Sequence, residues 1–323
     1  MFLSRRHAAA GLLALGGAAL PLTRALAQPT PDAAGAVDET PARVDTGRDA
    51  FEHMMAPVTI NGQGPFQFLM DTGANVSCVS RDLAQRLMLA ALPPRRVHTV
   101  VGVRERPGVL IDTLKVGDRS RRGVHATALA LDKNLDGVLG VDWLDGQRLE
   151  MGFKAKSLAI TRSKIDVAKE GAVAVVPARR RYGQLTIVDA DLGGKRINAM
   201  IDSGSQLTIC NYALRAMVSA ANRRSGASDA YSRVGMETLL GESFSGELIY
   251  LPFMRLGGLQ LGNVPVVYSD MHVFELWGLK DKPAVILGMD LLTQFDTVAL
   301  DFGRSQVRFD LAQTPTPRAP LGA

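Results

Sequence analysis

The same short pattern occurs twice in this sequence, and the duplication limits the available folds more than any other feature does. Residues 68–80 read FLMDTGANVSCVS, and residues 199–210 read AMIDSGSQLTIC. Each copy is followed further along by Leu-Gly-x-Asp, within GVLGVDWL at 137–144 and VILGMDLL at 285–292. A single Asp-Thr-Gly is common in turns, whereas two copies with the same downstream companion are hard to obtain by chance. The chain is therefore predicted to contain two related halves.

The residues around Asp71 and Asp202 indicate what chemistry the two copies could perform. An apolar run before each aspartate predicts a buried strand that ends at the carboxyl group, and the glycine two residues later permits a tight turn. If the two turns face each other, the carboxyl groups lie about 3 Å apart, where both cannot ionise and one proton is shared. One carboxylate can then accept a proton from water while the other group donates one to a carbonyl oxygen.

On these motifs the chain resembles retropepsin-type aspartic proteases, specifically bacterial members in which two such lobes are fused in one polypeptide. The resemblance covers roughly residues 51–310, with D-T-G-A nearer the retroviral pattern and D-S-G-S nearer the pepsin pattern. It implies an all-β, two-lobed acid-protease (double retropepsin-like) fold with short helices. It places the active site at the lobe interface under a covering flap, with Asp71 and Asp202 as the catalytic dyad.

The resemblance also implies roles for the residues that follow each aspartate. Thr72 and Ser203 would tie the lobes together through hydroxyl-to-backbone hydrogen bonds, and Gly73 and Gly204 would shape the turns. The residues expected to contact the substrate are Ala74, Asn75, Ser205, Gln206 and, in the flap, Gly102. Asn75 and Gln206 stand where the retroviral pattern commonly has an acidic residue.

One difference between the two copies predicts unequal carboxyl groups. The residue three after the aspartate is Ala74 in the first copy and Ser205 in the second. The Ser205 hydroxyl is expected to donate a hydrogen bond to the Asp202 carboxylate, which favours the charged form and lowers the pKa. Asp71 has no such hydroxyl beside it.

Each half contains a candidate flap between its aspartate motif and its Leu-Gly-x-Asp. The first is residues 97–106, with Gly102 near the tip, and the second is residues 231–247, which contain three glycines. A glycine-tipped hairpin can close over a substrate and exclude water. Ordinary hairpins of a β protein have the same sequence features, so that interpretation stays open.

Most of the remaining sequence predicts strands that repeat between the halves. Hairpins are predicted at 57–70 and 187–201, each leading into an aspartate, and both are followed by a helical pattern, at 80–89 and 211–221. Asn211 is the expected N-cap of the second helix.

Matched closing strands are predicted at 149–153 and 298–302. The lobes are accordingly expected to span residues 51–165 and 166–310. Each is near the size of a small domain, so one chain supplies both halves of the site and a monomer is expected.

The N-terminal residues have the features of an export signal. Residues 1–27 begin with Arg5 and Arg6, continue with an apolar run too short to span a bilayer comfortably, and end in Ala-Leu-Ala. Cleavage is predicted after Ala27, which gives a periplasmic or secreted protein with no stable membrane insertion. Ser4-Arg5-Arg6 partly resembles a twin-arginine signal, and general secretory export remains the alternative.

Two further segments are predicted to lie outside the lobes. Residues 28–50 are predicted to form a flexible leader, and residues 311–323 a disordered tail, because both are rich in proline and small residues.

Other chemistries are disfavoured. The histidines show no metal-binding spacing, and the Asp132 segment, which resembles the start of a calcium loop, has Trp143 where a chelating glutamate belongs. The arginine clusters carry no interleaved aromatic residues, so a solvated surface is expected rather than a nucleic-acid site. No cofactor or metal is expected. Cys78 and Cys210 should be free, buried thiols, since they flank opposite sides of the cleft.

These observations lead to one hypothesis and two alternatives. The chain is predicted to be an exported aspartic endopeptidase that acts on peptide or protein substrates. The alternatives are a non-catalytic peptide-binding or sensor module on the same fold, and a structural periplasmic protein with a relic dyad. Asp71 and Asp202 are both present, which favours catalysis, because degeneration usually removes one member of such a pair.

Overall fold

A computed structural model describes residues 54–132, 134–168, 173–226 and 231–311. It also describes the backbone of three short strands nearer the N-terminus: β1 (Ala8–Ala10), β2 (Ala14–Leu15) and β3 (Ala42–Asp45). The predicted cleavage site after Ala27, most of the predicted signal and leader, and residues 312–323 of the predicted tail lie outside the described residues. Leu311 is the last residue of a strand, so the tail prediction began one residue too early.

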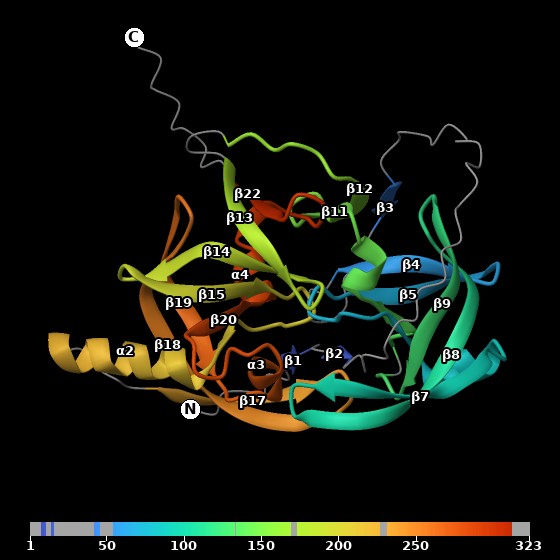
Figure 1. Ribbon diagram of the computed structural model, residues 1–323, viewed down its shortest axis with the longest axis horizontal. Coiled ribbons are helices and arrows are strands. Elements are labelled where there is room, and N and C mark those ends of the chain that lie inside the picture. Colours follow the sequence, from blue (N-terminus) through green and yellow to red (C-terminus); the bar gives the residue numbers. More distant parts are fainter. Residues whose placement is uncertain are drawn as a thin grey trace, which may run out of the picture.

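The chain forms a mostly β structure with two barrel lobes, as the sequence predicted (Figure 1). The first lobe contains one short α-helix, α1 (Arg81–Arg86), one 3-10 helix, η1 (Val141–Leu144), and the strands β4 (Met55–Ile60), β5 (Gln63–Met70), β6 (Cys78–Ser80), β7 (Ala90–Thr99), β8 (Gly102–Val116), β9 (Arg119–Leu129) and β10 (Gly137–Leu139). The sheet closes on itself because β8 pairs with both β4 and β9.

The second lobe repeats this arrangement. Its strands are β14 (Gln184–Leu192), β15 (Lys195–Ile201), β16 (Ile209–Cys210), β17 (Ser232–Thr238), β18 (Ser243–Leu256), β19 (Leu259–Tyr268) and β20 (Ala284–Leu287). Its helices are α2 (Tyr212–Ser225), α3 (His272–Leu276) and α4 (Met289–Leu292). Closure comes from β18, which pairs with both β19 and β14.

Local sequence signals explain the elements that lead into and out of each motif. The β4–β5 turn uses Asn61 and Gly62 at φ 50° and 80°, and the β14–β15 turn uses two glycines at φ 62° and 80°, backbone angles that these residues tolerate. The Ser80 hydroxyl accepts from the Leu83 amide at the start of α1. The Asn211 side chain does the same for Leu214 at 3.0 Å, so the predicted N-cap is confirmed.

Parallel strand pairing explains why each aspartate motif has a Leu-Gly-x-Asp companion. β10 pairs with β5, and β20 pairs with β15, so each companion strand ends beside its aspartate. The Asp71 amide donates to the Leu139 carbonyl, and the Asp202 amide donates to the Leu287 carbonyl, both at 3.0 Å. The companion is therefore a neighbouring strand that fixes the end of the aspartate strand.

A shared sheet joins the lobes, and the sequence did not predict it. It contains β11 (Gln147–Gly152), β12 (Ser157–Arg162), β13 (Val173–Arg181), β21 (Phe295–Asp301) and β22 (Gln306–Leu311). The closing strands of the two halves, β11 and β21, pair antiparallel with each other. One apolar core cluster runs through both lobes and this sheet.

A buried ion cluster fastens the connection between β12 and β13 to the shared sheet. Asp166 lies in this connection and accepts hydrogen bonds from the guanidinium groups of Arg148 and Arg308. Arg308 also pairs with Asp310 at 2.6 Å. Asp301 accepts from the Ser163 hydroxyl at 2.6 Å. The two lobes are thus held as one unit next to their shared site. Among the described residues, no helix is long and apolar enough to cross a bilayer.

Candidate active site

The two motif aspartates meet at the interface between the lobes. Asp71 follows β5, Asp202 follows β15, and both side chains are fully buried, with the Asp202 carboxyl group next to that of Asp71. Burial raises the pKa of Asp71 well above its usual value, and the neighbouring Asp202 raises it further. The Gly73 and Ala74 amides act in the opposite direction. Two carboxyl groups placed this way disfavour double ionisation, so they are able to share one proton.

Backbone amides hold the carboxylates in place. The Gly73 amide donates to Asp71 Oδ1 at 2.8 Å, and the Ala74 amide donates to the same oxygen at 3.0 Å. In the other lobe the Gly204 amide donates to Asp202 Oδ1 at 2.9 Å. These donors hold one oxygen of each carboxylate within its own turn.

Thr72 and Ser203 exchange hydrogen bonds across the lobe interface. The Thr72 hydroxyl donates to the Ile201 carbonyl at 2.9 Å, and the Ser203 hydroxyl donates to the Met70 carbonyl at 2.7 Å. Each hydroxyl also accepts from the opposite backbone amide, at 3.0 and 3.1 Å. These are the hydroxyl-to-backbone bonds that the motif implied, and they lock one turn against the other.

Gly73 and Gly204 are required for space rather than for an unusual backbone angle. Both lie in a turn, as the sequence predicted, and neither has a positive φ. A Cβ atom on Gly73 would lie 2.5 Å from the Asp202 Cγ, and one on Gly204 would lie 2.5 Å from Asp71 Oδ1. Each glycine therefore leaves the room that the opposite carboxyl group occupies.

The residues expected to contact the substrate fall into two groups. Ala74 and Ser205 are fully buried, and their carbonyls accept from the Val141 and Met289 amides at 2.8 Å. Asn75 and Gln206 are half-buried. The prediction that the Ser205 hydroxyl donates a hydrogen bond to Asp202 is wrong. The single Ser205 hydroxyl proton is donated to the Leu207 carbonyl at 2.8 Å.

The aspartates of the Leu-Gly-x-Asp segments stabilise the loop after each motif. These aspartates are not helix N-caps, because those positions are occupied by Gly140 and Gly288. Asp142 instead accepts from the Ser77 hydroxyl at 2.8 Å, and Asp290 accepts from the Thr208 hydroxyl at 2.7 Å. The same two hydroxyls accept from the Gly140 and Gly288 amides. This repeated link joins each motif to its companion strand.

Both candidate flaps are hairpins, and each reaches toward the opposite lobe. β7 and β8 form the first, in which Thr99 pairs with Gly102 around the turn, and β17 and β18 form the second (Figure 1). Val100 of the first flap packs in an apolar cluster of the second lobe. Leu239 and Leu240 of the second flap pack against a cluster of the first lobe.

Polar contacts fasten the tip of the first flap. The Thr99 hydroxyl donates to Glu242 of the second flap at 3.2 Å. The His272 amide donates to the Val100 carbonyl at 2.9 Å, and the imidazoles of His98 and His272 stack with their ring nitrogens 3.1 Å apart. Burial lowers the pKa of His98, as do its neighbours His272 and Arg96. The contact therefore disfavours a charged His98 imidazole.

Strands from the N-terminus show that both flap edges accept extended backbone. β1 pairs in parallel with Met236 to Thr238 of β17, and β2 pairs antiparallel with Val97 and His98 of β7. An extended chain beside these edges can therefore be held by backbone hydrogen bonds that are independent of its side chains.

Sequence reasoning missed Gln184, because a lone glutamine belongs to no motif. Its buried side-chain amide donates a hydrogen bond to the Gly73 carbonyl. Gln184 begins β14 of the second lobe, so it supports the Asp71 turn of the first lobe from across the interface.

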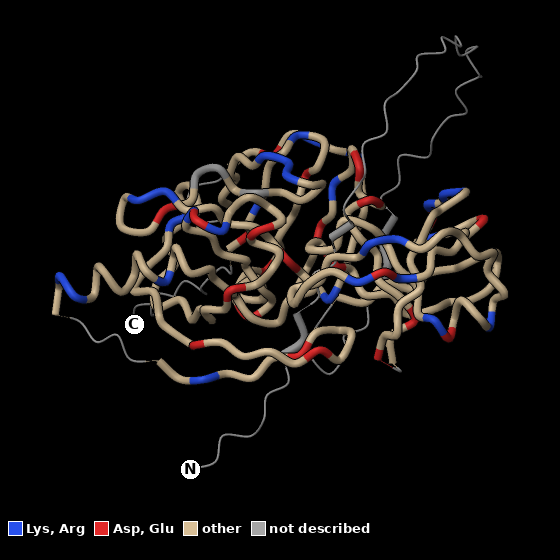
Figure 2. The backbone as a smooth tube through the Cα atoms, turned by 60° about the horizontal axis from the view of Figure 1, so that its bottom comes forward, with Lys and Arg blue, Asp and Glu red and all other residues tan. Residues whose placement is uncertain are grey.

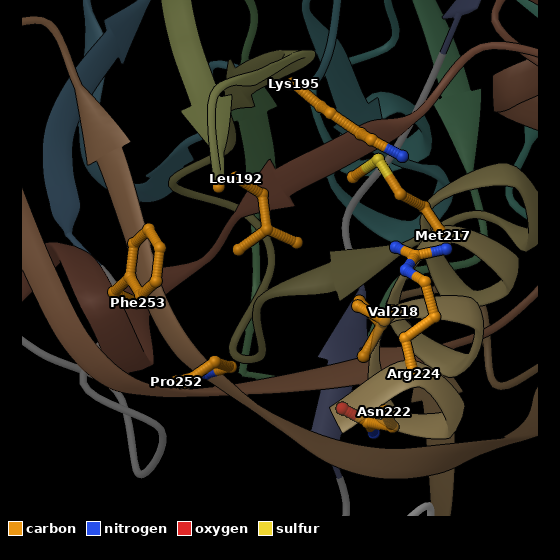
Figure 3. A pocket seen from close by; sticks show the side chains of 10 residues that line it. Leu192, Lys195, Met217, Val218, Asn222, Arg224, Pro252 and Phe253 are labelled. Atoms are coloured by element: carbon orange, nitrogen blue, oxygen red, sulfur yellow. The ribbon is translucent and has the colours of Figure 1, made fainter. Parts of the chain in front are cut away.

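A separate pocket lies beside α2 in the second lobe (Figure 3). It has a volume of about 160 Å³ and lies between α2, the β14–β15 turn and β18. Leu192, Met217 and Phe253 are among its apolar lining residues, and Lys195 and Arg224 contribute cationic groups. None of its lining residues belongs to the aspartate turns or the flap tips.

Lys and Arg are spread over both lobes with Asp and Glu among them (Figure 2). Arg121 stacks on Trp143 at 5.1 Å, an aromatic partner that the sequence reasoning did not foresee. Cys78 and Cys210 are free and buried, as predicted. Within the described ranges, no group of three or more His, Cys, Asp or Glu side chains could hold a metal ion.

Comparison with known proteins agrees with the duplication. The family model described as aspartyl protease matches residues 56–143 and again residues 188–291. Each match covers one aspartate motif together with its Leu-Gly-x-Asp companion. A search of curated proteins found no match.

Proposed function

Because the chain belongs to the aspartyl protease family, we propose that it is an exported aspartic endopeptidase in which Asp71 and Asp202 activate water to hydrolyse peptide bonds. The observation that supports this most strongly is the pair of buried, facing carboxyl groups, one from each lobe. Such a pair supplies an acid and a base at the same place and pH.

In the proposed reaction, the ionised carboxylate takes a proton from a water molecule, and the oxygen of that water attacks the peptide carbonyl carbon. The protonated carboxyl group gives its proton to the carbonyl oxygen, which forms a neutral tetrahedral diol. A carboxyl group next protonates the nitrogen, the C–N bond breaks, and a diol hydroxyl returns its proton to the dyad. One water is consumed, and the dyad regains its single proton. Amide donors at Asp71 favour negative charge on that residue.

The proposed substrate is an extended peptide that lies between the dyad and the two flaps. The pairing of β1 and β2 with the flap strands supports this geometry. Asn75 and Gln206, half-buried beside the dyad, are proposed as substrate contacts. The interlocked flap tips would exclude bulk water, which strengthens the electrostatic interactions inside the site.

Export and assembly are further parts of the proposal. Residues 1–27 would direct the chain out of the cytoplasm and be removed after Ala27. The mature chain would work as a monomer, because one polypeptide carries both aspartate turns.

Digestion of a peptide mixture tests the proposed activity. The chain beginning at Gln28 is incubated with a diverse peptide mixture from pH 3 to pH 8, with and without a statine-containing inhibitor, and new termini are identified by mass spectrometry. We expect internal cleavages that the inhibitor abolishes and that Asp202→Asn does not produce. Peptide binding without cleavage at any pH would instead indicate a non-catalytic binding module.

A further inference from the structure

Gln184 is placed to act on the catalytic turn through one peptide group. It follows the β13–β14 turn at Tyr182 and Gly183, and only 2% of its surface is exposed. Its side-chain nitrogen donates to the Gly73 carbonyl. The same peptide unit carries the Ala74 amide, which donates to Asp71 Oδ1 at 3.0 Å. Gln184, the Gly73–Ala74 peptide and Asp71 therefore form a chain of hydrogen bonds.

Successive hydrogen bonds through one peptide group reinforce each other. A donor at the carbonyl oxygen withdraws electron density from the amide, so the N–H on the other side becomes a stronger donor. Here the stronger donor points at a carboxylate oxygen, where it favours the charged form. The Ala74 amide is one of the two backbone groups that lower the pKa of Asp71 against burial and Asp202.

The buried polar side chain of Gln184 is only partly hydrogen-bonded. Its Oε1 accepts no hydrogen bond within the described part of the chain, so the side chain loses solvation there without compensation. An apolar side chain of similar size would avoid that cost. Among the described residues, the one hydrogen bond of this side chain is the bond that its nitrogen donates to the Gly73 carbonyl in the Asp71 turn.

We propose that Gln184 is a positioning residue for the dyad. Its amide holds and polarises the Gly73–Ala74 peptide, and thereby favours the ionised Asp71 carboxylate that accepts the proton of the attacking water. This role rests on the proposed protease function. The titratable groups facing Asp71 are Asp202 across the interface and Cys78 in its own lobe, with Asp142 beyond Cys78. Burial raises the pKa of the Cys78 thiol, so it stays neutral.

The test replaces the donor and follows the titration of the dyad. Gln184→Met keeps the length of the side chain and removes its hydrogen-bond donor. Without this donor the ionised form of Asp71 is less favoured, so its pKa rises and the acidic limb of kcat/KM should move to higher pH by roughly 0.2–0.6 unit. A shift of this size corresponds to a fraction of the energy of one charge-assisted hydrogen bond. Ile187→Val, a buried change in the same strand, is the matched control and should leave this limb in place. An unmoved limb in Gln184→Met would overturn the proposal.

A second readout does not require activity. In protein labelled with ¹³C at aspartate carboxyl carbons, the Asp71 titration should move to higher pH in Gln184→Met and stay unchanged in Ile187→Val. A chain that hydrolyses no peptide would contradict the proposed function, yet this titration would still decide the role of Gln184. Hydrolysis with an unmoved titration would contradict the inference alone.

The variant Gln184→Glu provides a rescue. A carboxyl group buried at this position stays protonated, because burial raises its pKa. Its O–H group can then donate to Gly73 as the amide does. The Asp71 titration should lie within about 0.1 unit of wild type. A shift in Gln184→Glu as large as that expected for methionine would overturn the proposal even if Gln184→Met fails to fold.

Discussion

The space left by Gly204 predicts a large effect from a very small change. In Gly204→Ala the new methyl carbon would lie 2.5 Å from Asp71 Oδ1. Non-bonded heavy atoms prefer a separation of about 3.5 Å, so the Asp71 carboxylate or the turn must move by about 1 Å. A displacement of that size costs about 10²-fold in rate, which corresponds to about 2.7 kcal/mol in the activation barrier.

The assay is kcat/KM on a peptide that the wild type cleaves, together with the thermal midpoint of unfolding. Gly258→Ala is the matched control, because Gly258 has no positive φ and a Cβ there would meet nothing within 4 Å. We expect Gly258→Ala to keep wild-type activity. If Gly204→Ala folds and keeps kcat/KM within about threefold of wild type, the close approach of the two turns is not what sets the dyad geometry.

Three further predictions concern the interface, the flap and the assembly. Ser203→Ala leaves the Met70 carbonyl and the Thr72 amide buried without this partner, so the free energy of unfolding measured with denaturant should fall by about 2–3 kcal/mol. The pKa of His98 is lower in the folded than in the unfolded protein, so the unfolded chain binds a proton at His98 more readily. The stability that neutral His98 contributes above about pH 6.5 is therefore lost as the pH falls below that value. The thermal midpoint of His98→Phe should vary less than that of the wild type between about pH 5 and pH 7. Sedimentation of active protein should give a monomer, and activity confined to a dimer would contradict a complete site in one chain.

The repeated parts of the fold could be predicted because each has a local signal. The Asn61-Gly62 turn, the Asn211 cap and the apolar runs before the aspartates specify their conformation within a few residues. The duplication then indicated that two such units face each other. This is why the hydroxyl-to-backbone bonds of Thr72 and Ser203 could be anticipated.

The shared sheet could not be predicted in the same way. The strands β11 and β21 each show an apolar pattern, which predicts a buried strand but does not name its partner. The Arg148–Asp166 pair depends on that partnering, because the two residues meet only when the sheet has formed.

Other side-chain partners in the site could not be predicted from the sequence. Ser205 was expected to bond to Asp202, yet the nearby Leu207 carbonyl takes its only proton. Gly73 was predicted to shape its turn, but the sequence did not indicate that the opposite carboxyl group leaves no room for a side chain there. Gln184 belongs to no sequence motif, and its hydrogen bond to Gly73 depends on how the second lobe packs against the first.

The central claim is that Asp71 and Asp202 act as one catalytic unit, and the most direct test is the kcat/KM of Asp71→Asn, Asp202→Asn and the double variant, with unfolding midpoints measured alongside. Residues that share one proton are not independent, so each single change should reduce kcat/KM by about 10³-fold or more, and the double variant should be no worse than a single one. If either single variant cleaves at close to the wild-type rate, or if the losses multiply in the double variant, the shared dyad is contradicted.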